Sequence, residues 1–337
     1  MKGAAPRRRL GVTLEDWALK TPFRITGHVF TSTPVVLVTV AEGPHEGRGE
    51  AAGVYYLNDT PAAAAVQLEA VRAAVEAGLQ RNALQTLLPA GCARNALDCA
   101  LWDLEWQRTG TPAWSLAGVG APRRLVTTFT LGADAPDAMA QAARAYDARA
   151  LKLKLTGDAL DGERVIAVHA ACPDAELAVD ANQGFTPDTL DALWPVLEAG
   201  NVTLVEQPFP AGRESWLDGM ARPIRIAADE SAQTTLDIDS LRGRFDVVNI
   251  KLDKSGGLTE ALAMAAHARA CGLGVMVGNM TGTSLCMAPA FLLGQLCDVA
   301  DLDGPVLLAR DRTPGVRYAN GMIGIPEAFW GGVATGD

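Results

Sequence analysis

From about residue 124 onward, short apolar runs alternate with stretches whose apolar positions recur at helical spacing. The runs that we expect to form buried strands lie at 125–131, 150–155, 177–182, 202–208, 224–231, 247–252, 274–279 and 299–304. Helices are expected between several of them, at 136–148, 162–171, 187–199 and 258–271. This alternation predicts parallel strands joined by right-handed crossovers. Eight strands fit a closed barrel better than an open sheet, so we predict an α/β fold of the TIM-barrel type.

The first 120 residues follow a different pattern. An apolar run at 35–40 precedes a turn-rich, glycine-containing stretch at 42–53, which predicts a small antiparallel sheet. Helical periodicity follows at 61–88 and again at 93–107. Residues 1–120 are therefore expected to form an α+β domain whose loops can reach a neighbouring domain.

The C-terminal tail is expected to return to that first domain. Residues 318–325 are predicted to form a strand that joins the N-terminal sheet. We therefore expect a capping domain over 1–120, completed by about 310–337, and a barrel domain over 121–309.

Two lysines lie on one face of the predicted strand at 150–155. Side chains two residues apart in a strand point the same way, so Lys152 and Lys154 are expected to face the barrel interior. Two neighbouring ammonium groups favour each other's neutral form, which predicts a lysine able to act as a base near neutral pH. The alternative is a pair of surface lysines on an amphipathic strand.

Three carboxylates end successive predicted strands. Asp180, Glu206 and Asp229 are each preceded by small or β-branched apolar residues. Acidic oxygen ligands that converge at a barrel mouth suit a hard divalent cation, and these strand ends carry no Cys or His ligand that would favour zinc. Asn182 shares the face of Asp180 and could support this site or contact a substrate.

Another lysine ends the sixth predicted strand, on roughly the opposite side of the circle from Lys154. Strand geometry aims Lys251 inward, whereas Lys254 lies in the loop beyond the strand. A metal between two opposed amines predicts proton transfer at the carbon next to a carboxylate. One amine removes the α-proton, the other returns a proton to the opposite face, and the metal stabilises the enediolate between these steps.

Composition and charge exclude several classes of function. The chain of 337 residues has a net charge of −10, which argues against nucleic-acid or anionic-membrane partners because these require a basic surface. Apolar runs long enough to span a membrane are missing from the sequence, and Glu15 and Asp16 interrupt the segment where a signal peptide would have its apolar core. We therefore expect a cytoplasmic protein. The six cysteines form no CxxC pair and are expected to be buried thiols, with disulfides or a catalytic cysteine as the alternatives.

In order and spacing, the motifs resemble those of the enolase superfamily, in its muconate-lactonizing-enzyme branch. The matching segments are KLK at 152–154, VDAN at 179–182, VEQP at 205–208, ADES at 228–231 and NIKLDKSGG at 249–257. The resemblance implies a modified (β/α)7β-like TIM barrel with an α+β cap completed by the tail. It also implies one Mg²⁺ per subunit, bound by Asp180, Glu206 and Asp229, with Lys154 and Lys251 as the two acid/base residues.

The eighth predicted strand indicates the chemical class of the substrate. ADLDGP at 300–305 places Asp301 and Asp303 on one face, where two carboxylates suit a substrate with a free α-ammonium group. This segment resembles the DxD motif of dipeptide epimerases, in which the motif holds the amino terminus of the dipeptide. RNALDCALWDL at 94–104 is similar to the corresponding segment of the L-Ala-D/L-Glu epimerases in that group. A helix-capping or turn Asp pair is the alternative.

Further residues complete the set of substrate contacts that we expect. Lys152 and Thr128 come from the barrel strands, and Arg24 and Tyr55 come from loops of the cap. Arg24 could pair with a glutamate side chain of the substrate, because a guanidinium matches a carboxylate in shape and charge.

The hypothesis that follows is a Mg²⁺-dependent isomerase, a dipeptide epimerase of the Ala-Glu type that acts by two-base 1,1-proton transfer at the α-carbon of the C-terminal residue. Murein peptides contain such a dipeptide, so a role in cell-wall peptide metabolism is implied, and a homo-oligomer is expected. The same site could instead serve an N-acylamino acid racemase, an o-succinylbenzoate synthase or a cycloisomerase. A non-catalytic metal- or carboxylate-binding barrel and a Schiff-base aldolase are the remaining alternatives.

Overall fold

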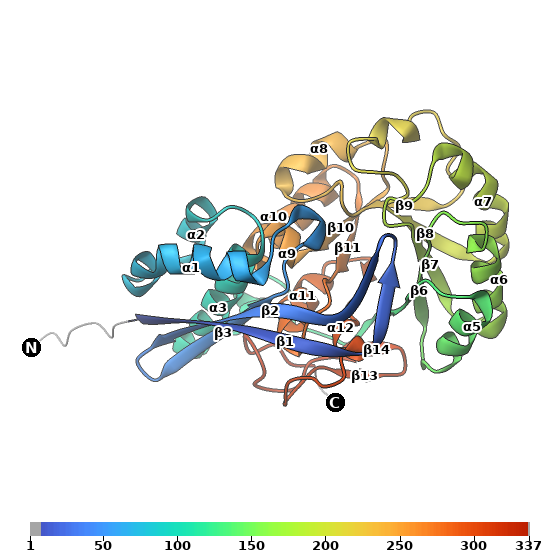
Figure 1. Ribbon diagram of the computed structural model, residues 1–337. Coiled ribbons are helices and arrows are strands. Elements are labelled where there is room, and N and C mark those ends of the chain that lie inside the picture. The colour runs from blue at the N-terminus through green and yellow to red at the C-terminus, as the bar shows by residue number, and fades with distance from the viewer. Residues whose placement is uncertain (1–7, 336–337) are drawn as a thin grey trace, which may run out of the picture.

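A computed structural model describes residues 8–335, so the first seven residues of the expected cap and the last two of the expected tail lie outside the described residues. The predicted barrel is confirmed: eight strands form one sheet in strict chain order, and each neighbouring pair is parallel (Figure 1). The strands are β5 (Thr128–Leu131), β6 (Ala150–Lys154), β7 (Glu176–Asp180), β8 (Val202–Glu206), β9 (Arg225–Ala228), β10 (Val247–Lys251), β11 (Gly274–Gly278) and β12 (Val299–Ala300).

The first and last barrel strands meet through side chains. Within residues 8–335 no strand pairing joins β5 to β12. Instead, the Thr128 hydroxyl donates to Asp301 Oδ1 at 2.6 Å, and the backbone N–H of Thr130 donates to Asp303 Oδ2 at 2.6 Å. The two aspartates of the DxD segment therefore also hold the barrel together at this seam.

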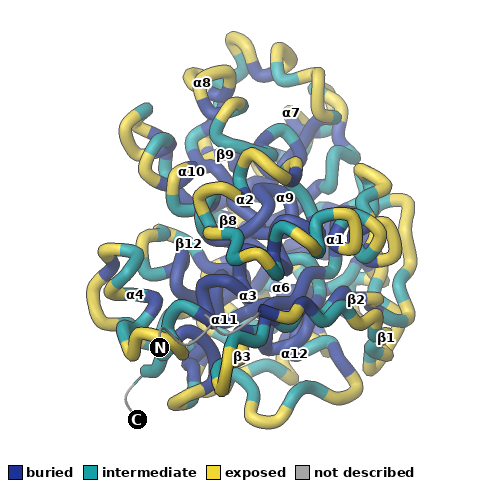
Figure 2. The backbone as a smooth tube through the Cα atoms, turned by 90° about the vertical axis from the view of Figure 1, so that its left-hand side faces the viewer, coloured by how far each residue is buried: buried dark blue, intermediate teal, exposed yellow. Residues whose placement is uncertain are grey.

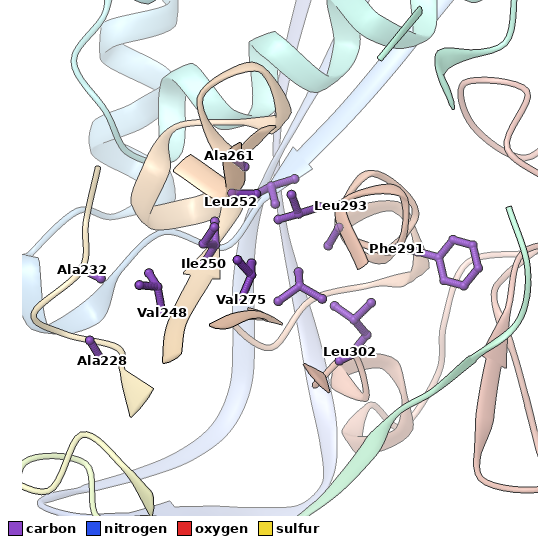
Figure 3. Close-up of a cluster of buried hydrophobic side chains, with 14 of the residues drawn as sticks. Ala228, Ala232, Val248, Ile250, Leu252, Ala261, Val275, Phe291, Leu293 and Leu302 are labelled. Atoms are coloured by element: carbon purple, nitrogen blue, oxygen red, sulfur yellow. The ribbon is translucent and has the colours of Figure 1, made fainter. Parts of the chain in front are cut away.

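Helices cover the outside of the barrel because alternate strand residues are apolar and face outward. Figure 3 shows Val248 and Ile250 of β10 and Val275 of β11 near Ala261 and Leu293 of the covering helices. Asn249 and Lys251, one residue out of phase, consequently face the interior. The elements around the barrel are α5 (Pro136–Arg144), α6 (Asp161–Ala171), α7 (Pro187–Ala199), η2 (Glu214–Leu217), η3 (Thr235–Asp237), α8 (Ile238–Leu241), α9 (Leu252–Ser255), α10 (Leu258–Ala270), α11 (Ser284–Gly294) and α12 (Gly304–Leu307).

The N-terminal region forms an antiparallel sheet covered by helices, as expected. The predicted helical stretch at 61–88 is two helices, because the backbone at Gly78 takes a φ of +101° that ends the first one. The hairpin of the first two strands reaches the mouth of the barrel, where Thr26 donates to the carbonyl of Leu155 at 3.0 Å (Figure 1). The elements are β1 (Arg8–Ile25), β2 (His28–Glu42), β3 (His45–Ala51), η1 (Tyr55–Leu57), α1 (Pro61–Glu76), α2 (Arg81–Leu87), α3 (Cys92–Thr109) and α4 (Ala113–Leu116).

Helix α3 lies between the cap sheet and the barrel. Its residues from Cys92 to Leu104 are all buried, and Figure 2 shows α3 as dark blue tube beside the equally buried α11. Two neighbours cover α3 at once, which explains why polar residues such as Asp98 are buried in it together with apolar ones.

The tail corrects one prediction. Strands β13 (Arg317–Ala319) and β14 (Met322–Gly324) form a hairpin that pairs with β4 (Leu125–Val126), so the predicted strand at 318–325 does not join the N-terminal sheet. The expected strand at 125–131 is split at Thr127 between this small sheet and the barrel. Beyond the hairpin, the chain does contact the cap.

Several hydrogen bonds contribute to that contact. Trp330 Nε1 donates to the carbonyl of Arg48 at 3.0 Å, and the N–H of Gly331 donates to Asp103 Oδ1 at 2.8 Å.

Among the described helices, none is long and apolar enough to cross a membrane.

Candidate active site

A row of charged side chains crosses the barrel mouth. The parallel register places Lys154 opposite Asp180 and Asp180 opposite Glu206 on three consecutive strands, and Asp229 directly follows β9. The three acids are buried, and each offers a carboxylate oxygen within 4.8 Å of the other two. The sequence placed these acids at successive strand ends, and the structure brings them together.

Each acid faces an ammonium group. Lys154 Nζ lies 2.5 Å from Asp180 Oδ2, and Lys251 Nζ lies 2.6 Å from Asp229 Oδ2. Strands β6 and β10, which carry these lysines, are four places apart in an eight-stranded barrel, so the lysines approach from opposite sides.

Lys152 occupies the space between the acid cluster and the barrel seam. Its Nζ lies 3.2 Å from Glu206 Oε2 and 3.8 Å from Asp180 Oδ2, and it also donates a hydrogen bond to Asp301. The predicted inward direction of Lys152 is thus observed. Together with Thr128, it ties Asp301 to the rest of the site.

The electrostatics correct the expectation that neighbouring lysines depress each other's pKa. Burial alone would lower the pKa of Lys152, but Asp301 and Glu206 outweigh burial and raise it. Burial likewise opposes the charged form of Lys251, and Asp229 and Glu206 outweigh it, so the pKa of Lys251 is raised. Attraction by the carboxylates exceeds repulsion between the amines because the carboxylates are in direct contact with them.

Lys254 and Gln207 hold Asp229 in place on the side away from Lys251. Lys254 Nζ lies 2.6 Å from Asp229 Oδ1 and donates to the carbonyl of Asn249 at 3.0 Å. Gln207 Oε1 accepts the backbone N–H of Asp229 at 2.9 Å. Burial raises the pKa of Asp229, but contacts with Lys251 and Lys254 outweigh burial and lower it. This carboxylate is therefore held ionised and in one orientation.

Two asparagines complete the surroundings of the other two acids, Asn249 through its side chain and Asn182 through its backbone. Asn249 Nδ2 donates to Glu206 Oε1 at 2.6 Å, and the backbone N–H of Asn182 donates to Asp180 Oδ1 at 2.8 Å. The Oδ1 atoms of both asparagines are buried and have no hydrogen-bond partner among residues 8–335. Both oxygen atoms are therefore available to accept a hydrogen bond from a ligand or to bind a cation.

The donor set fits a divalent cation. Six buried carboxylates and four buried ammonium groups leave two formal negative charges at the mouth; these groups are Asp180, Glu206, Asp229, Glu230, Asp301, Asp303, Lys152, Lys154, Lys251 and Lys254. Burial and the neighbouring Asp180 raise the pKa of Glu206 to about 7, and burial and Asp229 raise the pKa of Glu230 to about 8. Both shifts reflect burial first and repulsion from neighbouring carboxylates second, and a hard cation with oxygen ligands would neutralise the negative charge.

A cavity of about 220 Å³ opens beside the two lysines. Lys154 and Lys251 line it from the barrel, and Tyr55 lines it from the cap together with Phe23 and Phe30. The ring centroids of Tyr55 and Phe30 lie 5.4 Å apart, edge to face, so the cap presents a packed aromatic wall. The cavity therefore has reactive amines on one side and an apolar cover on the other.

Arg24 lies elsewhere. It lines a separate cavity with Thr130 and Asp134, whereas Ile25 lines the cavity of the lysines and Phe23 lies between the two cavities and lines both. Strand alternation accounts for this, because adjacent side chains of a strand point to opposite faces. The pairing of Arg24 with a substrate carboxylate stays a prediction.

Sequence reasoning missed some residues of this site. Gln207 holds the loop after β9, and Asn279, which lines the cavity, donates from Nδ2 to the carbonyl of Asp301 at 2.6 Å. Gln207 directly follows Glu206 in the VEQP segment and has a φ of +35°, a strained backbone conformation that only the structure reveals. Asn279 lies in the segment GNMTGTS at 278–284, and glycine-rich loops of this kind are too common to predict a site.

Comparison with known proteins agrees with this geometry. Residues 136–332 match the family model "Enolase C-terminal domain-like", and residues 7–118 match "Mandelate racemase / muconate lactonizing enzyme, N-terminal domain". The chain is similar to the L-Ala-D/L-Glu epimerase of Escherichia coli K12, with 40% identity over 94% of this chain and 99% of that protein.

Solved structures give the same result. An enolase family member from Agrobacterium tumefaciens, described as homologous to dipeptide epimerases and holding sodium and L-Ala-L-Glu, has a TM-score of 0.91 and 42% identity over 94% of this chain and 97% of that one. The dipeptide epimerase of Methylococcus capsulatus, complexed with Mg and L-Arg-D-Lys, has a TM-score of 0.89 and 31% identity over 97% and 99% of the two chains. This chain therefore belongs to the mandelate racemase/muconate lactonizing enzyme family, which combines this N-terminal domain with an enolase-like C-terminal domain.

Proposed function

We propose that this protein is a Mg²⁺-dependent isomerase, a dipeptide epimerase that acts on dipeptides of the Ala-Glu type by two-base proton transfer. The observation that carries the proposal is the approach of Lys154 and Lys251 to one cavity from opposite sides of a carboxylate cluster. A protein that only binds a ligand has no use for two opposed proton carriers. The names of the similar epimerases support the same reaction.

The two lysines exchange the α-proton of the C-terminal residue. The Nζ that is a neutral amine takes the proton from one face of the α-carbon, and the other Nζ, an ammonium group, delivers a proton to the opposite face, which inverts the centre. A cation held by the three carboxylates would offset the attraction that raises the pKa of Lys251 and so make its neutral form accessible. Proton transfer by a positioned side chain requires a short path, and both amines lie at the cavity surface. The aromatic wall formed by Phe23, Phe30 and Tyr55 keeps water away from the carbon while it is deprotonated.

Asp180, Glu206 and Asp229 are proposed to hold the Mg²⁺ ion. When bound, the ion supplies positive charge beside the substrate carboxylate, where negative charge grows as the α-proton leaves. Asn249 keeps Glu206 oriented for that task, and Lys254 and Gln207 keep Asp229 oriented. Asn182 and Lys152 support the same cluster from the strands at its other side.

Asp301 and Asp303 are proposed to receive the free ammonium group of the dipeptide, with Thr128 and Lys152 positioning Asp301. Replacing Asp303 with Asn keeps an oxygen to accept the N–H of Thr130 but removes the negative charge. The variant should lose at least about tenfold in kcat/KM toward a dipeptide, since a hydrogen bond to a charged group is worth about 1.5–3 kcal/mol. An N-acylated amino acid lacks the ammonium group, so an enzyme for that substrate would be unaffected.

The cellular setting belongs to the same proposal. All six cysteines are free, which supports a reducing compartment and hence a cytoplasmic location. An Ala-Glu substrate points to the metabolism of cell-wall peptides, and we propose a homo-oligomer that needs no macromolecular partner for catalysis. We also propose a cap over 1–120, completed by about 310–337, and a barrel domain over 121–309.

The test is epimerisation of L-Ala-L-Glu followed by NMR in buffer that contains Mg²⁺. Conversion to L-Ala-D-Glu should stop when EDTA removes the ion and return when Mg²⁺ is added in excess. Replacing exposed Lys20 with Gln provides a control that leaves the site intact. Conversion that continues in EDTA, or borohydride trapping of a substrate adduct, would contradict the proposal in favour of metal-free chemistry.

A further inference from the structure

A second cluster of metal-binding side chains lies outside the barrel mouth. Asp239 belongs to α8, and His267 and Cys271 lie at the C-terminal end of α10, before the strand that follows. His267 and Cys271 are four residues apart, so they share one face of the helix. This face meets the acidic side chain of α8.

The three side chains converge on a common point. Asp239 Oδ1 lies 3.3 Å from His267 Nε2 and 3.4 Å from Cys271 Sγ, and Sγ lies 3.8 Å from Nε2. Tetrahedral zinc has bonds of about 2.0–2.2 Å to nitrogen and oxygen and about 2.3 Å to sulfur, which separate the same atom pairs by about 3.3, 3.5 and 3.6 Å. The triad already has nearly the spacing of three zinc ligands.

Charge and access agree with this spacing. A thiolate, a carboxylate and a neutral imidazole together carry two negative charges, which balance a divalent cation. The Asp239 side chain is 72% exposed and that of His267 is 37% exposed, so an ion can enter from solvent and a water molecule can complete the tetrahedron. Burial and the hydrogen bond to Asp239 raise the pKa of the Cys271 thiol, and the charge of Arg242 only partly opposes this shift, so an ion would bind by displacing the thiol proton.

We propose that Asp239, His267 and Cys271 form a binding site for a zinc-type divalent ion, separate from the carboxylate cluster. Ligand chemistry distinguishes the two sites: the carboxylate cluster offers only oxygen, which suits Mg²⁺, whereas the outer site also offers sulfur and imidazole. A bound ion would join α8 to the end of α10. Because it binds only the folded chain, zinc would raise the midpoint of thermal unfolding.

Co²⁺ is a direct probe, because only a thiolate ligand gives a sulfur-to-cobalt charge-transfer band in the near ultraviolet. Titration of the intact protein in saturating Mg²⁺ should give this band with one Co²⁺ per chain, and Zn²⁺ should abolish it. The band should be absent from Cys271→Ala. In His267→Gln the dissociation constant for Co²⁺ should rise at least tenfold. Cys172→Ala, which removes another half-buried thiol, should keep it.

The epimerase reaction provides the fold control. Cys271→Ala should retain Mg²⁺-dependent epimerisation, since the residue is remote from the cavity, while it loses the zinc-induced rise in the unfolding midpoint. Absence of the cobalt band in the intact protein, or its persistence in Cys271→Ala, would overturn the proposal. Neither result depends on whether the chain is an epimerase.

Discussion

Asp229 illustrates what a single residue of this site requires. Its buried carboxylate contacts two lysines at 2.6 Å each, and Gln207 holds its backbone N–H. A buried charge with so many partners is fixed before any ligand arrives, which lowers the cost of ordering the site upon binding. The second lysine, Lys254, is therefore a positioning residue that acts through Asp229.

Lys254→Met tests this role. The substitution leaves the Asp229 carboxylate and the Asn249 carbonyl short of a donor, so the free energy of unfolding should fall by about 3–5 kcal/mol in the absence of metal. Saturating Mg²⁺ should restore part of this loss, because the ion neutralises the same carboxylate. Urea unfolding with and without Mg²⁺ measures both effects, with Lys20→Met as the control. A loss below about 1 kcal/mol would show that Lys254 does not hold Asp229.

At this scale, alternation along strands predicted most of the site. It oriented Lys152, Lys154 and Lys251 inward and placed the acids at strand ends. It misjudged Lys254, because α9 begins directly after β10 and turns this side chain back to the strand end. It also could not anticipate that Arg24 lines a neighbouring cavity, since the irregular register between Ala18 and Phe23 sets that side of the hairpin.

At the scale of elements, α3 and the turn after β10 pack so closely that each restricts the residues allowed in the other. Arg94 donates to the carbonyl of Gly256 at 3.2 Å, and Asp98 accepts the N–H of Thr259 at 2.9 Å. A Cβ atom on Gly257 would lie 2.6 Å from Asp98 Cβ, and this glycine has a φ of +114°. The RNALD and KSGG segments, far apart in the chain, are thus two sides of one contact between cap and barrel.

Gly257→Ala should consequently reduce the free energy of unfolding by about 3–5 kcal/mol, because it combines a strained φ with a clash against backbone-anchored atoms. Gly219→Ala is the matched control: Gly219 also has a positive φ, +75°, but no atom within 4 Å of the added Cβ. Its cost should be about 1 kcal/mol. If chemical denaturation gave the same loss of free energy of unfolding for both variants, α3 would have to shift to make room for the added methyl group.

Element types were easier to predict than their partners. The β/α alternation fixed the order of barrel strands because parallel neighbours follow the chain. The tail hairpin carried no such constraint: a strand at 318–325 can pair with any exposed edge, and in the structure β4 provides that edge.

At the scale of the whole molecule, buried aspartates connect the cap to the barrel and to the C-terminal tail. Asp253 Oδ1 accepts the N–H groups of Ala52 and Gly53 at 2.8 and 3.0 Å, and Asp103 accepts that of Gly331. Burial raises the pKa of Asp253 to about 7 and the pKa of Asp103 to about 6. Because these values exceed the ordinary value of 3.8, the folded protein binds the protons more tightly than the unfolded chain.

The stabilising contribution of Asp253 is therefore complete below about pH 4 and lost as the pH rises through about 7. Asp253→Asn mimics the protonated form at every pH. At pH 8 the variant should exceed the unmodified protein in free energy of unfolding, by up to about 4 kcal/mol for a shift of about three units, and the gain should vanish toward pH 4. Urea unfolding at pH 4, 6 and 8 measures it; a pH-independent difference would contradict the assignment.

The central claim is that two opposed lysines serve the two faces of one carbon, and NMR of α-proton exchange in deuterated buffer tests it directly. Lys154→Gln and Lys251→Gln should each fail to epimerise L-Ala-L-Glu or L-Ala-D-Glu. Each variant should still exchange the α-proton of one diastereomer, and the two variants should differ in which one. Exchange of the same diastereomer by both variants, or epimerisation by either, would contradict the account.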